Sequence, residues 1–126
     1  MEDKKLRYST SENINLGTVQ IADDVVAIIA GLAATEVEGV KAMAGNITNE
    51  LVAKLGMKNL SKGVEVEVDN NRVKVGVSLI LSYGYKIPDV SNKVQDKVKT
   101  AIENMTGLKV SAVNVRIANV DIENNN

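Results

Sequence analysis

The side chains that could support covalent catalysis gather in one short segment, from Ser82 to Lys86. Its order is Ser-Tyr-Gly-Tyr-Lys, and Ser, Tyr and Lys can form nucleophile–base sets. The segment also follows an alternating apolar stretch and precedes Pro88. Gly84 within it suits a sharp bend. It therefore reads more simply as the turn between a strand and a helix, and we expect no catalytic residue in it.

The residue types that most enzymes and metal sites need are missing. The chain has no His and no Cys, which removes the common general base, the thiolate nucleophile and the usual zinc ligands. None of the sixteen carboxylates is singled out by spacing, and no glycine-rich phosphate loop occurs. We expect no enzymatic activity, cofactor or metal, although a minor enzyme using Lys, Tyr or carboxylates remains an alternative.

Charge and aromatic content argue against nucleic acid as a partner. The net charge is -1, Tyr is the only aromatic residue type, and it occurs three times. The chain thus lacks both a basic field and the stacking platforms that single strands need. We expect no nucleic acid partner. A small nucleic-acid-binding α/β module is the alternative function, because domains of this size often bind RNA.

A long hairpin over 62–85 organises the chain. Every second residue is apolar in two runs, which is typical of strands with one buried face. A turn at Asn70-Asn71 predicts that Val66 faces Val75, because Asn tolerates the positive φ of hairpin turns. The two apolar runs are Val64, Val66, Val68 and then Val73, Val75, Val77, Leu79, Leu81.

Two helices are predicted around this hairpin. The first begins at Asp23 or Asp24, which can cap it, and presents an apolar stripe through Val37. The second runs from 88 to 106, with Pro88 in its first turn, and Gly107 ends it. Shorter elements are a short strand over 17–22, a weak strand or connection over 38–43 and a short helix that Thr48 can cap. The lysines near that short helix give a basic loop.

The last strand follows the second helix and contains VNVRIANV, whose alternation changes phase near Ala118-Asn119 and predicts a bulge there. The strand–helix–strand order predicts parallel strands. Whether this last strand pairs with 73–81 or with 64–68 stays open. We predict an α+β, two-layer fold, with a mixed sheet of long hairpin plus C-terminal strand and two main helices on one face. The expected organisation is a polar lead-in over 1–15, one α/β domain over 16–122 and a polar tail over 123–126.

The face of the sheet opposite the helices is the candidate interaction surface. Its centre carries small residues with one apolar side chain and one cation, which suits protein docking. An antiparallel sheet face can also be simply solvated, and that alternative stays open. The candidate residues are Gly76, Ser78, Ile80, Arg116 and Ala118.

Several motifs resemble one protein family. They are the helix ending in AATEVEGV, the Tyr83-Gly84 pair before the second helix, and VNVRI in the last strand. Together they resemble the alkaline-shock and general-stress proteins of Gram-positive bacteria, also called envelope stress response proteins, over about residues 17–120. The chain is similar to the short members of that family.

The resemblance implies a non-catalytic protein that supports cell-envelope homeostasis as an interaction or scaffold domain. It implies a cytoplasmic protein that can sit at the membrane through partners, and it transfers no catalytic or cofactor residue. The polar N-terminal segment is not a signal peptide, and no stretch is apolar enough for direct membrane insertion. Expected partners are proteins, among them a membrane-anchored one, and a homo-oligomer is a further option.

Overall fold

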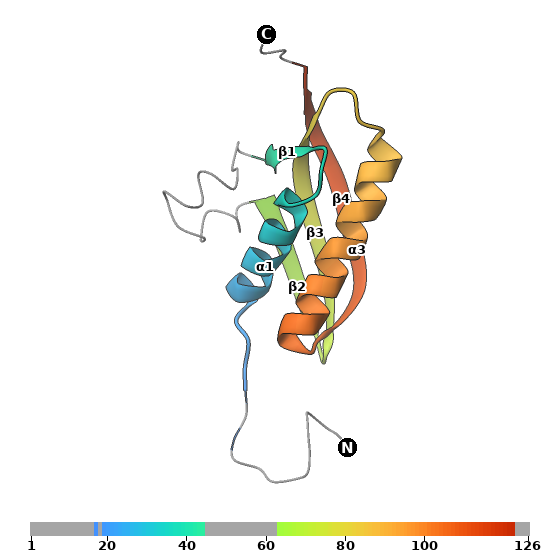
Figure 1. Cartoon of the computed structure of the whole chain (residues 1–126). Helices are drawn as coiled ribbons and strands as arrows, with labels where there is room; N and C mark the ends of the chain where they lie inside the picture. The colour runs from blue at the N-terminus through green and yellow to red at the C-terminus, as the bar shows by residue number, and fades with distance from the viewer. Residues whose placement is uncertain (1–16, 18, 45–62, 123–126) are drawn as a thin grey trace.

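The computed structural model describes residue 17 and the ranges 19–44 and 63–122, with two helices on one side of a sheet (Figure 1). The helices are α1 (Asp23–Thr35) and α3 (Ile87–Thr106). The strands are β1 (Val40–Met43), β2 (Val64–Asp69), β3 (Arg72–Ser82) and β4 (Lys109–Asp121). This is the predicted α+β fold.

Strand β3 is the centre of a four-stranded mixed sheet. β2 and β1 pair antiparallel with successive parts of β3, while β4 pairs with it in parallel along its whole length. The parallel pairing follows from the crossover through α3. The question left open by the sequence is therefore settled in favour of β3 as the neighbour of β4.

The hairpin has the predicted register, with Val66 opposite Val75 and Asp69 opposite Arg72. The positive φ of the turn lies at Asn70, at 58°, and Asn71 does not share it. A β-branched residue would therefore strain the backbone at position 70, the first of the two asparagines.

The helix boundaries are only partly those predicted. α3 has Pro88 in its first turn and ends at Gly107, whose φ is 78°, as expected. α1 begins at Asp23, but its N-cap is Ala22 and no side chain caps it. The predicted strand over 17–22 does not form among the described residues of that segment. The described residues of this segment pair with none of the four strands of the sheet.

The core lies between the two helices and the inner face of the sheet. The inward side chains of β3 are almost completely buried, because α1 covers β1 and β2 while α3 packs on β4 and α1 (Figure 1). Apolar residues near the ends of elements escape burial: Val25 is 46% exposed, Val68 40% and Met105 71%. The buried residues of α3 are Val90, Val94, Val98 and Ile102.

Strand β4 has two irregularities. Its pairing with β3 skips Ser111 and Ala118, and the second skip confirms the bulge predicted near Ala118-Asn119. Each extra residue restores the inward orientation of the apolar side chains that follow it. The predicted helix after Thr48 and the basic loop at Lys54, Lys58 and Lys62 lie outside the described residues.

Candidate functional site

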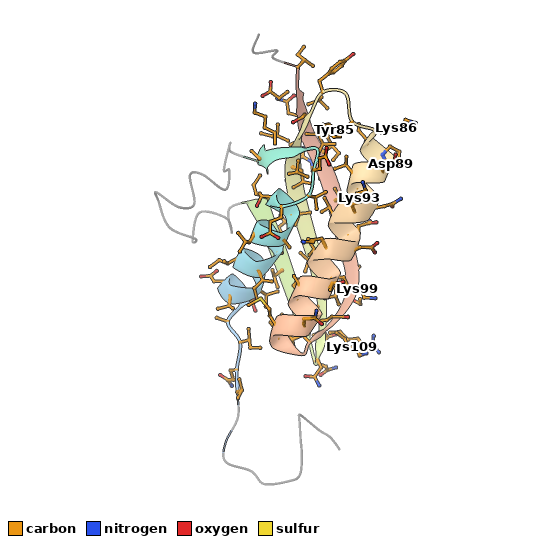
Figure 2. All side chains as sticks on the ribbon, viewed as in Figure 1. Tyr85, Lys86, Asp89, Lys93, Lys99 and Lys109 are labelled. Carbon is orange, nitrogen blue, oxygen red and sulfur yellow. The ribbon has the colours of Figure 1, made fainter. Side chains whose placement is uncertain are left out.

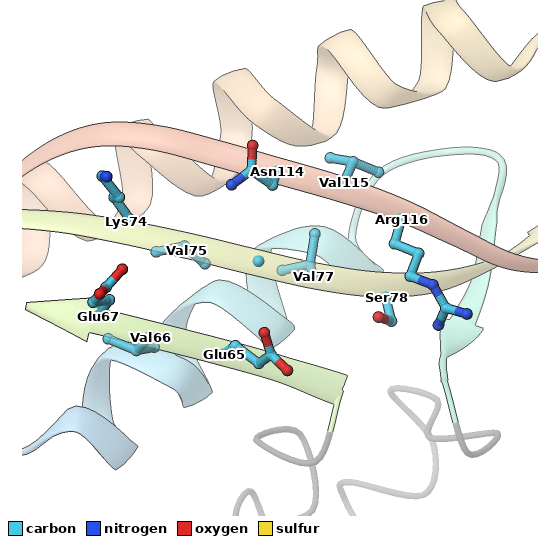
Figure 3. Close-up of a pocket in the computed structure, with 11 residues that line it drawn as sticks. Glu65, Val66, Glu67, Lys74, Val75, Val77, Ser78, Asn114, Val115 and Arg116 are labelled. Atoms are coloured by element: carbon cyan, nitrogen blue, oxygen red, sulfur yellow. The ribbon is translucent and has the colours of Figure 1, made fainter.

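The outer surface of the sheet, on the side away from the helices, is formed by alternate residues of β2, β3 and β4. We call it the open face. Its residues on β3 point outward because their neighbours Val75, Val77 and Leu79 fill the core. The helices lie behind the sheet when the open face is viewed from the front (Figure 3). The open face comprises Glu65, Glu67, Lys74, Gly76, Ser78, Ile80, Ser82, Asn114 and Arg116.

A shallow depression of about 740 Å³ lies on the open face, lined by residues of β2, β3 and β4. Gly76 is the middle one of the β3 residues that line it, and it pairs with Glu65 of β2 and Asn114 of β4. A Cβ atom built on Gly76 would have Glu65 Cβ as its nearest neighbour, at 3.9 Å. The centre is therefore hollow because glycine leaves the backbone bare, and ordinary side chains would fit there.

Charges of both signs line this depression. Glu65 and Glu67 project from β2, Lys74 from β3 and Arg116 from β4 (Figure 3). The hairpin register places Glu67 opposite Lys74. Two acids and two bases make the lining neutral overall, which favours a partner with mixed charge over a polyanion.

The structure brings together some of the predicted surface residues and separates others. Gly76, Ser78 and Arg116 line the depression, whereas Ile80 and Ala118 lie beyond it. Ile80 is opposite Ala42 on one side and Asn119 on the other. Sequence reasoning placed Glu65, Glu67, Lys74 and Asn114 on this face but not in the candidate set, and strand alternation alone would have included them.

The Ser82–Lys86 segment is the turn between β3 and α3, as the sequence predicts. Tyr83 is 73% exposed, and Lys86 lies at the start of α3 (Figure 2). The backbone N–H of Ser82 donates to the carbonyl of Gly39. The segment thus connects β3 to α3 and is hydrogen-bonded to the loop between α1 and β1.

Tyr85 makes the contact that sequence reasoning missed. Its hydroxyl donates a hydrogen bond to Glu38 Oε2 at 3.2 Å. This bond, together with the negative charge of Glu38, raises the pKa of Tyr85 above its ordinary value of 10.0. The tyrosine ring also lies against Gly39, where a Cβ atom would approach it to 3.0 Å. The AATEVEGV motif, which contains Glu38 and Gly39, thus meets the residue that follows the Tyr83-Gly84 motif.

The described residues hold neither a metal-ligand cluster nor a helix that could span a membrane. No group of three or more His, Cys, Asp or Glu side chains is placed to hold a metal ion within the described ranges. Neither described helix is long and apolar enough to cross a membrane.

Comparison with known proteins identifies the family. The model of the Asp23 family, described by a cell envelope-related function, matches residues 11–122. The uncharacterized protein YqhY of Bacillus subtilis is 34% identical over 123 residues, which are 98% of this chain and 91% of that protein. The uncharacterized protein Spy1614 of Streptococcus pyogenes is 35% identical over 116 residues, 90% of this chain and 96% of that protein.

Solved structures show where else the fold occurs. A MamM-CTD variant superposes with a TM-score of 0.50 at 9% identity and covers 79% of this chain and 100% of its own. At that identity the likeness concerns the fold alone. The matches in sequence confirm the family resemblance drawn from the residues themselves. The chain belongs to the Asp23 family, a name that is unrelated to the residue at position 23, and the function described for that family is cell envelope-related.

Proposed function

We propose that this chain is a non-catalytic interaction domain of a cell envelope-related system and that the open face is the surface that binds its protein partner. The observation that carries the proposal is the depression over Gly76, with charges of both signs at its margin. Protein interfaces commonly have a complementary centre with a polar rim. The domain would act in the cytoplasm and reach the membrane through a membrane-anchored partner.

The partner suited to this surface is a folded protein that presents an apolar side chain above Gly76. Acidic groups around that side chain would meet Arg116 and Lys74. Basic groups around it would meet Glu65 and Glu67. Complementary charges of this kind orient a partner and select against wrong ones. A nucleic acid would instead meet two carboxylates in the lining, and no observation favours it.

The test fills the depression without disturbing the fold. Gly76→Tyr places a large side chain where only ordinary contacts surround the new Cβ atom, and aromatic residues favour strands. Gly76→Ala is the matched control, since it removes the glycine but leaves most of the hollow. Both variants should melt close to the wild-type temperature.

The readout is capture of proteins from membrane and cytosolic fractions by immobilised chain, followed by mass spectrometry. A specific partner should be retained by the wild type and by Gly76→Ala, and its recovery should fall at least tenfold with Gly76→Tyr. Equal recovery with all three proteins would show that the partner binds elsewhere.

A further inference from the structure

The outer edge of β4 carries no neighbouring strand in the described part of the chain. β4 is the longest of the described strands, with 13 residues, and among them it pairs with β3 alone, along one side. An uncovered strand edge of this length is a template for pairing with another strand. We propose that β4 pairs antiparallel with β4 of a second copy of this chain, centred on Val115.

The hydrogen bonds at the ends of β4 show which backbone groups face β3. The N–H of Lys109 donates to the carbonyl of Asn71 at 3.0 Å, and the carbonyl of Asp121 accepts from Tyr83 at 3.1 Å. Successive residues of a strand direct their backbone groups to opposite edges, apart from bulges. The groups of the residues next to these two therefore point to the open edge.

Side-chain contacts agree with this orientation. The N–H of Val110 donates to Glu103 Oε2 at 3.0 Å, and the carbonyl of Val113 accepts from Gln95 Nε2 at 3.1 Å. The N–H of Val120 donates to Asn119 Oδ1 at 2.9 Å. Val115 and Ile117 share the inward side-chain orientation of Val113, so their backbone groups point to the same open edge.

The sequence of β4 is chemically self-complementary about Val115. In the centred register apolar residues meet apolar residues, polar meet polar, and the terminal charges have opposite sign. The bulges at Ser111 and Ala118 fall at similar distances on either side of the centre, so inward side chains meet inward ones. The facing pairs are Lys109 with Asp121, Val110 with Val120, Ser111 with Asn119, Ala112 with Ala118, Val113 with Ile117, and Asn114 with Arg116.

Neighbouring registers lose this match. A shift by one residue pairs inward with outward side chains along the strand. A shift by two residues either sets Arg116 opposite itself or brings Val110 against Ala118. Like charges directly opposite are unfavourable, so the register centred on Val115 is the one that the sequence favours.

The central part of the strand, residues 113–117, would carry most of the new hydrogen bonds. The Val113 carbonyl has two lone pairs, so it can keep Gln95 and still accept from Ile117 of the second copy. The N–H groups of Val110 and Val120 each have one hydrogen, which Glu103 and Asn119 already bind. The Asp121 carboxylate keeps its ion pair with Lys41, at 2.9 Å, when Lys109 of the second copy comes to lie opposite it.

The opposite edge of the sheet lacks this property. β2 reads Val-Glu-Val-Glu-Val-Asp, and an antiparallel pairing with itself about Val66 would set Glu65 against Glu67. Repulsion between these carboxylates protects that edge from self-pairing. β2 and β4 thus differ in charge pattern, and of these two strands β4 is the one whose pattern accepts a second copy.

Pairing through β4 would also join the two open faces. Asn114 and Arg116 line the depression and lie next to the centre of the new pairing. Two depressions would then lie side by side on one continuous sheet. The inference about β4 does not depend on what the depression binds.

The first test is cross-linking through single cysteines, since the chain has none. Val115→Cys brings two thiols into facing positions within the 7 Å Cα separation that a disulfide tolerates. Ala118→Cys is the control, because its two copies would be offset by about 20 Å along the strands. Oxidation should give a covalent dimer with Val115→Cys and almost none with Ala118→Cys. A mixture of Ala112→Cys and Ala118→Cys should cross-link as a heterodimer.

The second test is sedimentation equilibrium of two variants that introduce opposite charges at the same exposed position. Asn114→Arg faces Arg116 of the second copy and should weaken dimerisation about tenfold, whereas Asn114→Glu should strengthen it. Thermal unfolding of both variants checks that the domain itself is intact. A wild type that sediments as a monomer at all concentrations would overturn the proposal. Equal cross-linking of Val115→Cys and Ala118→Cys would also overturn it. So would a dimer that Gly76→Tyr disrupts and the Asn114 variants do not, since that dimer would form through the open face.

Discussion

At the scale of single residues, the junction between the end of α1 and the start of α3 depends on Gly39 and Tyr85. Gly39 has a φ of 99°, and a Cβ atom there would come within 2.9 Å of Val90 and 3.0 Å of the Tyr85 ring. The hydroxyl of that ring bonds Glu38. Because the folded state holds the Tyr85 proton more tightly, this contact contributes fully below pH 10.0 and is lost as pH rises through the raised pKa.

We predict that Gly39→Ala destabilises the domain by about 3 kcal/mol, because the new methyl group meets both backbone strain and two close neighbours. The control is Gly84→Ala, at a φ of 102° with nothing within 4 Å. It should cost only the strain, about 1 kcal/mol. Chemical denaturation measures both, and equal losses would mean that the contact with Tyr85 is not tight.

At the scale of elements, the hairpin depends on a turn whose strained position is now assigned. Asn70 has the positive φ, and β-branched residues resist that conformation. Asn70→Val should therefore lower the free energy of unfolding by about 1–2 kcal/mol, and Asn71→Val by clearly less. Thermal or urea unfolding of the pair decides this, and a larger loss at Asn71 would contradict the assignment.

Helix α3 is held by a narrow buried stripe, and Val94 at its middle is completely buried. Val94→Asp places an unpaired carboxylate in the core, where α3 packs on β4 and α1, and we expect that the variant does not fold. Lys93→Asp makes the same carboxylate at an exposed neighbouring position and should remain folded. Circular dichroism distinguishes the two, and a folded Val94→Asp would mean that this stripe is not part of the core.

At the scale of the whole molecule, the two-layer fold leaves one face of the sheet and one long edge without cover in the described residues. The helices occupy the other face (Figure 1). On the other edge, the carboxylates of β2 disfavour pairing of that strand with itself. The open face and the β4 edge meet at Asn114 and Arg116. Because Gly76 lies on the central strand β3 and not at this edge, a substitution there tests partner binding separately from self-pairing.

We predict that Ile80→Glu leaves the fold intact and reduces partner capture, because Ile80 is half-buried on the open face next to the depression. Ile122→Glu makes the same change at a side chain that is 70% exposed, past the end of β4, and should leave capture unchanged. The capture assay and a melting curve test both. Unchanged capture by Ile80→Glu would limit the binding surface to the depression itself.

The sequence by itself determined the elements whose signals are local. Alternation over 64–81 specified the hairpin and its register, because a one-residue slip would expose the whole apolar set. Pro88 and Gly107 marked the ends of α3, since both act through their own backbone. Alternation in this hairpin and in the last strand assigned Gly76, Ser78 and Arg116 to one face. The family was identified from short motifs, which are local too.

The tertiary structure decided what depends on neighbours distant in sequence. It chose β3 over β2 as the partner of β4, placed Ile80 and Ala118 outside the depression, and brought Gly39 against Tyr85. It also turned Val25 outward while burying Val26 and Ala30 of the same helix. A hydrophobic pattern states that a side chain will be buried, whereas packing between elements decides which neighbour buries it.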